Sequence, residues 1–157
     1  MTLTVRRPEY ADLGRYTELA VEFIAAAPIS QFIPAEANNV ADFLIGAMDN
    51  PSVAMWLAEI DGKIVGICGA LCYPLFFSPQ HTIVQELWWW LTPAARGSGA
   101  GQAMHKTLEE WAKEKGAALV LMIALADDRV EKTSKFYERA GYKPLERTFA
   151  KGIAPWQ

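Results

Sequence analysis

A glycine-rich turn stands directly in front of a helical run in the stretch LTPAARGSGAGQAM, residues 91–104. Gly97, Gly99 and Gly101 alternate with small residues, and Arg96 precedes them. Glycine lets successive backbone N–H groups converge without obstruction by a Cβ atom. A helix that begins at such a turn adds the positive end of its dipole, so the expected ligand is a phosphate group.

The spacing of the glycines excludes two familiar nucleotide motifs. A dinucleotide fingerprint needs the pattern G-x-G-x-x-G, and counting from Gly97 puts Gln102 where the last glycine should be. A Walker loop needs a Lys followed by Ser or Thr directly after its last glycine, and Gln102 and Ala103 stand there instead. The pattern that remains is R-x-x-G-x-G, from Arg96 to Gly101, between a predicted strand and an amphipathic helix.

A second segment, KFYERAGYKP at residues 135–144, carries an aromatic-Tyr-Glu-x-x-Gly-aromatic pattern on the last predicted helix. Together the two segments resemble the GNAT superfamily of N-acetyltransferases, and the order of predicted elements matches over nearly the whole chain. The resemblance implies an enzyme that uses acetyl-coenzyme A (acetyl-CoA) as co-substrate, without a metal. It would move the acetyl group directly to a primary amine of a small molecule, or to the N-terminus of a protein or peptide.

The resemblance also assigns a cofactor site. The pyrophosphate of coenzyme A would lie on the amides of the turn, with the Arg96 guanidinium alongside. The strand at residues 82–91 would separate from the next strand, and pantetheine would pair with the free edge at Trp89 and Leu91. The cofactor-binding residues expected on this basis are Trp89, Leu91, Arg96, Gly97, Ser98, Gly99, Ala100, Gly101, Gln102 and Tyr137.

Acetyl transfer to an amine needs a base, stabilisation of an oxyanion and an acid for the leaving thiolate. Tyr137 matches the tyrosine of the family pattern, and its phenol is the expected acid; packing against the cofactor is the alternative role. Glu86 is the expected base, because it precedes Trp88 by two positions on a strand, which places both on one face. Burial beside indoles would raise its pKa toward neutrality. A surface or ion-paired carboxylate is the alternative for Glu86.

The acceptor pocket is expected around three consecutive tryptophans. Alternation along a strand directs Trp88 and Trp90 to one face and Trp89 to the other. The face with Trp88 and Trp90 would wall the pocket and favour an apolar or aromatic amine, with core packing as the alternative for at least one indole. His81, in a predicted loop at residues 75–81, could reach the substrate.

Other polar residues carry weaker expectations. His105 is expected at the surface or near the cofactor, and it competes with His81 as a weaker candidate for the base. Many relatives have an Asn seven residues before the tyrosine, and Val130 stands there instead, which weakens one expected contact to pantetheine. The basic residues that could reach the 3′-phosphate, or simply form a solvated helix face, are Arg129, Lys132 and Lys135.

Cys68 and Cys72 lie in an apolar run, too far apart along a strand for a disulfide. No histidine or helix N-terminus stands beside them to activate a thiolate, so we expect core thiols and no covalent cysteine route. The second functional hypothesis is a non-catalytic acyl-CoA-binding sensor or regulatory module on the same fold. The presence of Tyr137 and Glu86 argues against it.

The elements that must position these residues are predicted from periodicity and turn signals. The predicted strands are residues 3–7, the runs flanking Asp61-Gly62 up to Pro74, and residues 82–91, 117–125 and 147–153. The predicted helices begin at Ala11 and near Asn39, and two more cover residues 99–115 and 129–140. The order βααβββαβαβ predicts an α/β (α+β) fold with a mixed, mostly antiparallel central sheet flanked by helices. The GNAT resemblance adds that strands four and five splay apart.

Length and charge set the remaining expectations. The 157 residues suit a single domain over 1–157, and a net charge of −3 argues against a nucleic-acid partner. No apolar run is long enough for a membrane span, and the opening MTLTVRRPEY does not read as a signal peptide. A cytoplasmic protein is therefore expected, and the resemblance leaves room for a homodimer.

Overall fold

The computed structural model describes residues 1–153. Its strands are β1 (Leu3–Arg6), β2 (Val53–Ile60), β3 (Lys63–Leu75), β4 (Ser78–Leu91) and β5 (Leu119–Leu121). Its α-helices are α1 (Leu13–Ala26), α2 (Ala37–Met48), α3 (Ala100–Glu114) and α4 (Val130–Arg139). Short 3₁₀ turns lie at Tyr10–Asp12, Pro28–Gln31 and Pro93–Ala95. None of the helices in the described part of the chain combines the length and apolarity needed to span a bilayer.

The strands form one sheet in the order β1-β2-β3-β4-β5. Neighbouring strands are antiparallel except β4 and β5, which are parallel and are joined through α3. The turn between β2 and β3 uses Asp61 and Gly62, both with positive φ (49° and 76°), as a tight hairpin requires. The predicted α+β fold with a mostly antiparallel sheet is therefore confirmed.

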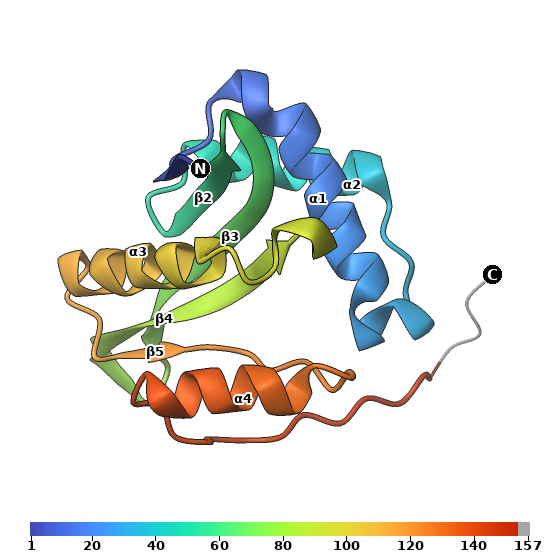
Figure 1. Cartoon of the computed structure of the whole chain (residues 1–157). Coiled ribbons are helices and arrows are strands. Elements are labelled where there is room, and N and C mark those ends of the chain that lie inside the picture. Colours follow the sequence, from blue (N-terminus) through green and yellow to red (C-terminus); the bar gives the residue numbers. More distant parts are fainter. Residues whose placement is uncertain (154–157) are drawn as a thin grey trace.

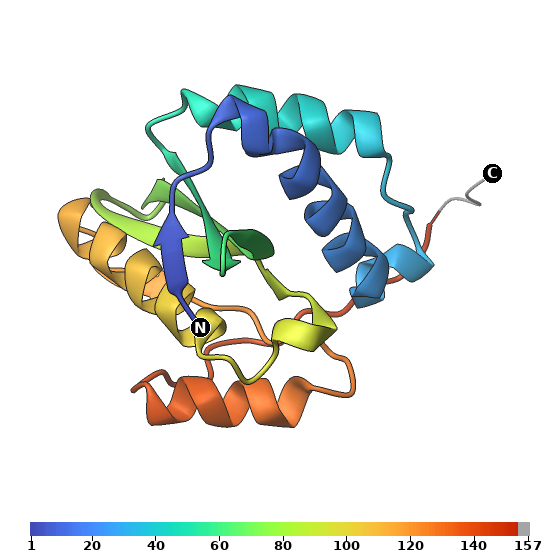
Figure 2. The same cartoon turned by 45° about the horizontal axis from the view of Figure 1, so that its top comes forward.

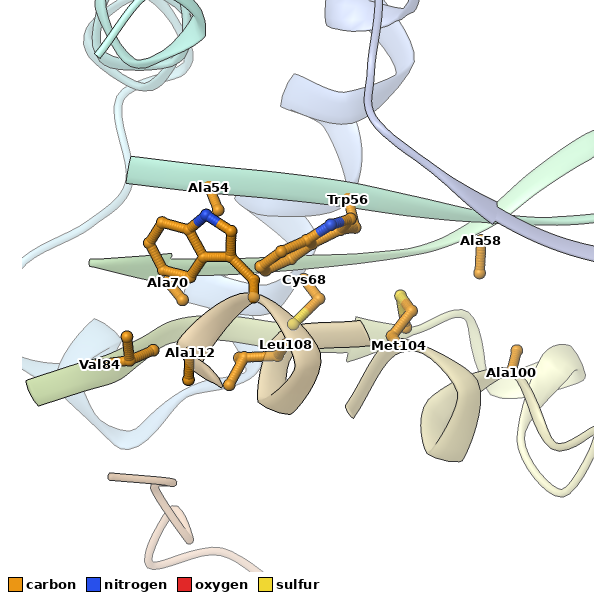
Figure 3. Packing of buried hydrophobic residues seen from close by; sticks show 11 residues of the cluster. Ala54, Trp56, Ala58, Cys68, Ala70, Val84, Ala100, Met104, Leu108 and Ala112 are labelled. Atoms are coloured by element: carbon orange, nitrogen blue, oxygen red, sulfur yellow. The ribbon is translucent and has the colours of Figure 1, made fainter. Parts of the chain in front are cut away.

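Helices cover both faces of the sheet (Figures 1 and 2). α1 and α2 pack on one face, and α3 packs on the other with α4 beside it (Figure 2). On the α3 face, Met104 and Leu108 are fully buried against Cys68 and neighbouring small residues of the sheet (Figure 3). Each such aliphatic side chain contributes about 1.5–3 kcal/mol by burial, so this layer holds α3 firmly on the sheet.

A β-bulge in β4 changes which side chains face which layer. Ala70 pairs with Glu86 and Gly69 pairs with Trp88, so Leu87 has no opposite residue in β3, a strand described along its whole length. A bulge inserts one extra residue and breaks the simple alternation of faces. Glu86 therefore points to the α3 face, whereas Trp88 packs into the α1–α2 core. The prediction that these two residues share a face is wrong for this reason.

The tryptophans themselves follow the predicted alternation. Trp88 and Trp90 belong to the core under α1 and α2, and Trp89 packs against the core under α3. The prediction succeeds here because all three residues lie beyond the bulge, where alternation resumes.

β4 and β5 separate after a short parallel contact, as expected from the fold class. Their pairing runs from Ile83 with Leu119 to Gln85 with Leu121, and Figure 1 shows β5 continuing as an irregular segment that diverges from β4. The predicted strand at residues 117–125 is therefore much shorter than expected. Beyond Gln85, the edge of β4 that faces β5 is not paired with any described strand.

Two further boundaries differ from the predictions. Residues 143–153 form neither helix nor strand, so the predicted strand at residues 147–153 is wrong. The segment has strand-like composition, but Phe149 and Ile153 are exposed, and Figure 1 shows it running away from the end of α4 with no strand beside it. The predicted loop at residues 75–81 is also wrong, because β3 and β4 continue as a long hairpin whose turn is Phe76-Phe77.

Candidate active site

The glycine turn presents free backbone amides at the start of α3. Gly97 and Gly99 have φ values of 85° and 90°, a left-handed conformation that side chains disfavour. Gly99 is the N-cap of α3. Among the described residues, no acceptor is recorded for the N–H groups of Gly97, Gly99, Gly101 or Gln102. The turn therefore offers convergent donors at the positive end of a helix.

The remaining amides of the predicted cradle are already engaged within the turn. The Ser98 N–H donates to the Ala95 carbonyl at 3.2 Å, and the Ala100 N–H lies 3.3 Å from Ser98 Oγ. These bonds hold the loop in shape. The structure thus divides the expected phosphate-binding run into donors that face outward and donors that stabilise the turn.

Two arginines lie on Trp90 beside this turn. The guanidinium carbon of Arg96 is 4.9 Å from the centroid of the Trp90 ring, and that of Arg129 is 5.3 Å away. Arg129 also pairs with Asp127 at 2.7 Å. Desolvation lowers the pKa of Arg96 and the neighbouring Arg129 charge lowers it further, whereas the charges of Asp127 and Asp128 oppose this shift. Arg129, at the N-terminus of α4, therefore lies on the same indole as Arg96, beside the glycine turn. Lys132 and Lys135 are exposed.

Glu86 and Tyr137 meet on one residue in the gap between β4 and β5. The Glu86 carboxylate accepts a hydrogen bond from the Ile123 N–H at 3.0 Å. The Tyr137 hydroxyl donates to the Ile123 carbonyl at 3.0 Å. Glu86 is 3% exposed and Tyr137 is 6% exposed, so both polar groups are removed from bulk water. Ile123 lies beyond the paired part of β5, and its backbone groups are satisfied by these side chains instead of by β4.

The electrostatics of the gap favour proton transfer near neutral pH. Burial raises the pKa of Glu86 to about 7, and the hydrogen bond from the Ile123 N–H opposes that rise. Burial and the nearby Glu86 carboxylate raise the pKa of Tyr137 above its ordinary value of 10, so the phenol stays protonated. A carboxyl that titrates near 7 can take a proton from an amine, and a protonated phenol can give one to a thiolate.

Cys68 lies on the face of the sheet that packs against α3, and its thiol is not activated. Its side chain is fully buried, and burial with the nearby Glu86 charge raises the pKa of the thiol well above 9. Cys72 is partly buried further along β3. A neutral thiol in the core is a poor nucleophile.

Trp89 connects the glycine turn to Tyr137. Its indole Nε1–H donates to the Gly101 carbonyl at 3.2 Å, and its ring lies 5.8 Å from that of Tyr137. A Cβ atom at Gly101 would come within 3.3 Å of the indole, so a side chain there would require the indole to shift by a few tenths of an ångström. The backbone of Trp89 and Leu91 lies on the unpaired edge of β4, next to the turn.

The opposite face of β4 carries an aromatic wall. The Trp88 ring lies over Gly69, where a Cβ atom would come within 2.3 Å of it. Its Nε1–H donates to the Tyr16 hydroxyl at 2.8 Å, and that hydroxyl donates to the Cys68 carbonyl at 2.9 Å. Phe43 packs edge-on against Trp88 with its own ring half exposed. The sequence does not predict that Tyr16 and Phe43 contact Trp88. Tyr16, for example, lies at one of the regularly spaced apolar positions that any amphipathic helix shows.

Neither histidine lies at the aromatic wall. His81 is exposed near the hairpin end of β4, hydrogen-bonded to Ser78, and about 20 Å along the strand from Trp88. The structure does not bring it to the aromatic wall. His105 is 5% exposed, between Tyr142 and Glu109, so the expected surface position is wrong, and the alternative position near the cofactor stays a prediction. Among the described residues, no cluster of three or more His, Cys, Asp or Glu side chains could hold a metal ion.

A comparison with family models agrees with this site, in which Glu86 and Tyr137 both bond to Ile123 beside the open edge of β4. A model of the acetyltransferase (GNAT) family matches residues 16–142. The chain belongs to this family. No protein with a curated description matches the sequence.

Solved structures share the fold over nearly the full length of both chains. An acetyltransferase from Trypanosoma brucei is 25% identical, with a TM-score of 0.72, covering 97% of this chain and 100% of its own. The acetyltransferase AAC(6′)-Iy, bound to a bisubstrate analogue built on CoA, is 14% identical with a TM-score of 0.76, covering 99% and 100%. A transcriptional regulator from Bacillus halodurans is 18% identical with a TM-score of 0.76, covering 97% and 100%.

Proposed function

We propose that this GNAT protein is an acetyl-CoA-dependent N-acetyltransferase that transfers the acetyl group directly to a primary amine. The observation that carries the proposal is the meeting of Glu86 and Tyr137 on Ile123, inside the gap between β4 and β5. A base with a pKa near 7 and a protonated acid are bonded to the N–H and to the carbonyl of the same residue.

Coenzyme A fits the donors that the fold leaves open. The pyrophosphate would accept hydrogen bonds from the free amides of the glycine turn, with Arg96 and Arg129 supplying positive charge. Pantetheine would extend along the unpaired edge of β4 at Trp89 and Leu91, as an added strand does. This path directs the thioester toward Glu86 and Tyr137.

The chemistry can then be followed proton by proton. Glu86 removes one proton from the ammonium group, and the free amine attacks the thioester carbonyl carbon. Backbone N–H groups on the open edge of β4 stabilise the oxyanion. The carbon–sulfur bond breaks as Tyr137 releases the Ile123 carbonyl and protonates the thiolate. The amide nitrogen gives up its second proton, which restores Tyr137, and Glu86 returns its proton to water.

The acceptor we propose carries an apolar or aromatic body. The aromatic wall consists of Trp88 from β4 and Phe43 from α2. Exposed apolar side chains follow at Ile29 and Ile33, on the connection between α1 and α2. Indole and phenyl surface favours an amine with an aryl or alkyl group, including an apolar protein or peptide N-terminus. A polycation would want more carboxylates than this wall offers.

The test is coenzyme A release measured by thiol capture with acetyl-CoA and a panel of amines. The panel would include aryl-alkyl amines, alkyl amines, an aminoglycoside and peptides with free N-termini. We expect thiol release with the aryl-alkyl or peptide members and loss of release in Glu86→Gln. Tight acetyl-CoA binding without release on any amine would instead support the sensor hypothesis.

A further inference from the structure

The end of α4 ties Tyr137 to the residue that follows the helix. Gly141 has a φ of 94°, and its N–H donates to the Glu138 carbonyl at 3.1 Å. The Tyr142 N–H then donates to the Tyr137 carbonyl at 3.0 Å. This pair of bonds is a Schellman motif, in which a left-handed glycine turns the chain back onto the last helical turn. The backbone of Tyr142 is therefore bonded directly to that of Tyr137.

The Tyr142 side chain anchors this helix end to α3. Its hydroxyl donates to Glu109 Oε1 at 2.8 Å and lies 3.1 Å from His105 Nε2. Because the hydroxyl proton is directed at Glu109, His105 must carry its proton on Nε2 and donate to the hydroxyl oxygen. Burial lowers the pKa of His105, which keeps the ring neutral in this role.

The same residues pack around Tyr137. The Tyr142 ring lies 5.7 Å from the Tyr137 ring, and His105 packs edge-on against Phe136 at 5.2 Å. Within α4, all of which is described, Tyr137 is the one residue classed as buried. A ten-residue helix is marginal without tertiary contacts, so few contacts determine where it sits.

We propose that Tyr142, held by His105 and Glu109, is a positioning residue that orients the Tyr137 hydroxyl toward the reacting sulfur. The proposal rests on the proposed function for the role of Tyr137. In this role Tyr142 acts through Tyr137, by fixing the end of α4 at the turn that follows Tyr137. Loss of its hydroxyl frees α4 to move against α3 and carries Tyr137 away from the gap.

The test is a double-mutant cycle in the full chain, with steady-state rates for Tyr142→Phe, Tyr137→Phe and the combined variant. We expect Tyr142→Phe to lower kcat about tenfold while the KM for acetyl-CoA stays within about twofold. In the Tyr137→Phe background, the same change should have no further effect on kcat. An equal loss in both backgrounds, or no loss in the wild-type background, would overturn the proposal. Full kcat in Tyr137→Phe would overturn it as well.

A matched control separates positioning from general loosening. Tyr73 is also partly buried, and its hydroxyl donates to Gln85 at 2.6 Å on the β3–β4 hairpin, away from α4. Tyr73→Phe should lose a comparable hydrogen bond without the drop in kcat. A tenfold drop in Tyr73→Phe would count against a specific role for Tyr142.

Hydrogen exchange gives a readout that needs no turnover. In Tyr142→Phe we expect the amides of residues 130–141 to exchange at least about tenfold faster than in the wild type, with α3 unchanged. Unchanged protection of α4 would overturn the anchoring role. If the wild type acetylates no amine, the proposed function fails, and this measurement still decides whether Tyr142 holds α4.

Discussion

Replacing Glu86 with Gln should separate the charge of this residue from its place in the fold. Glu86 is 3% exposed, and burial raises its pKa from 4.5 to about 7. The Gln side chain keeps an oxygen that can accept the hydrogen bond from the Ile123 N–H. It has no ionisable group, so both proton transfer and the pH dependence linked to this site are removed together.

The magnitude follows from the pKa difference. Between pH 4.5 and about 7 the folded protein binds the Glu86 proton more tightly than the unfolded chain does. The free energy of unfolding therefore contains a contribution that is fully present below pH 4.5 and is lost as the pH rises through about 7. At 1.36 kcal/mol per pKa unit, the wild type loses up to about 3 kcal/mol over that interval from this site. Glu86→Gln loses none of it.

Urea unfolding at pH 5 and pH 8, paired with steady-state kinetics, measures both consequences. We expect the two proteins to differ little at pH 5 and Glu86→Gln to be more stable by up to about 3 kcal/mol at pH 8. Wild-type kcat/KM should rise with pH up to about 7 and then level off, whereas the variant should lose about 10²–10⁴ in kcat without that rise. A stability difference that is the same at both pH values, or near-normal turnover in the variant, would refute the reasoning.

Three further predictions concern the turn, the thiols and the aromatic wall. Gly99→Val and Gly116→Val place a side chain at a positive φ at opposite ends of α3 (90° and 66°), and each should cost about 1–2 kcal/mol of stability. By isothermal titration calorimetry, the Gly99 variant should lose at least about tenfold in acetyl-CoA affinity; the same loss in the Gly116 variant would contradict the assignment of the turn. Replacing Cys68 and Cys72 together with Ala should leave kcat within about threefold, and abolished turnover would point to a covalent route. Phe43→Ala should raise the KM for aryl-alkyl amines about fivefold without changing the KM for acetyl-CoA, and an unchanged amine KM would place the acceptor elsewhere.

Residue spacing was enough to locate the glycine turn and α4. Gly97 and Gly99 adopt the left-handed conformations that an amide turn before a helix requires, and Gly141 closes α4 in the same way. These are local backbone demands, which glycine meets and other residues meet at a cost. The alternation of Trp88 and Trp89 is likewise local, because successive strand residues face opposite sides wherever no bulge intervenes.

The partners of the proposed acid and base depended on contacts between distant segments. The bulge at Leu87 turns Glu86 to the α3 face, and nothing in the strand sequence marks where such an extra residue will fall. Its meeting with Tyr137 on Ile123 requires β4 and β5 to separate after a short contact, a property of the sheet as a whole. The sequence shows His105 only as a polar residue on a helix, whereas in the fold it packs against Phe136 of α4 and is buried.

The sequence by itself therefore determined the family pattern, the glycine turn, the order of the elements up to α4 and the identity of the acid and base candidates. Tertiary structure alone decided which face carries Glu86, what holds Tyr137, and that residues 147–153 form no strand. The physical reason is that glycine conformations and side-chain periodicity are set within a few residues. Pairing, burial and pKa depend on neighbours that the chain brings together only when it folds.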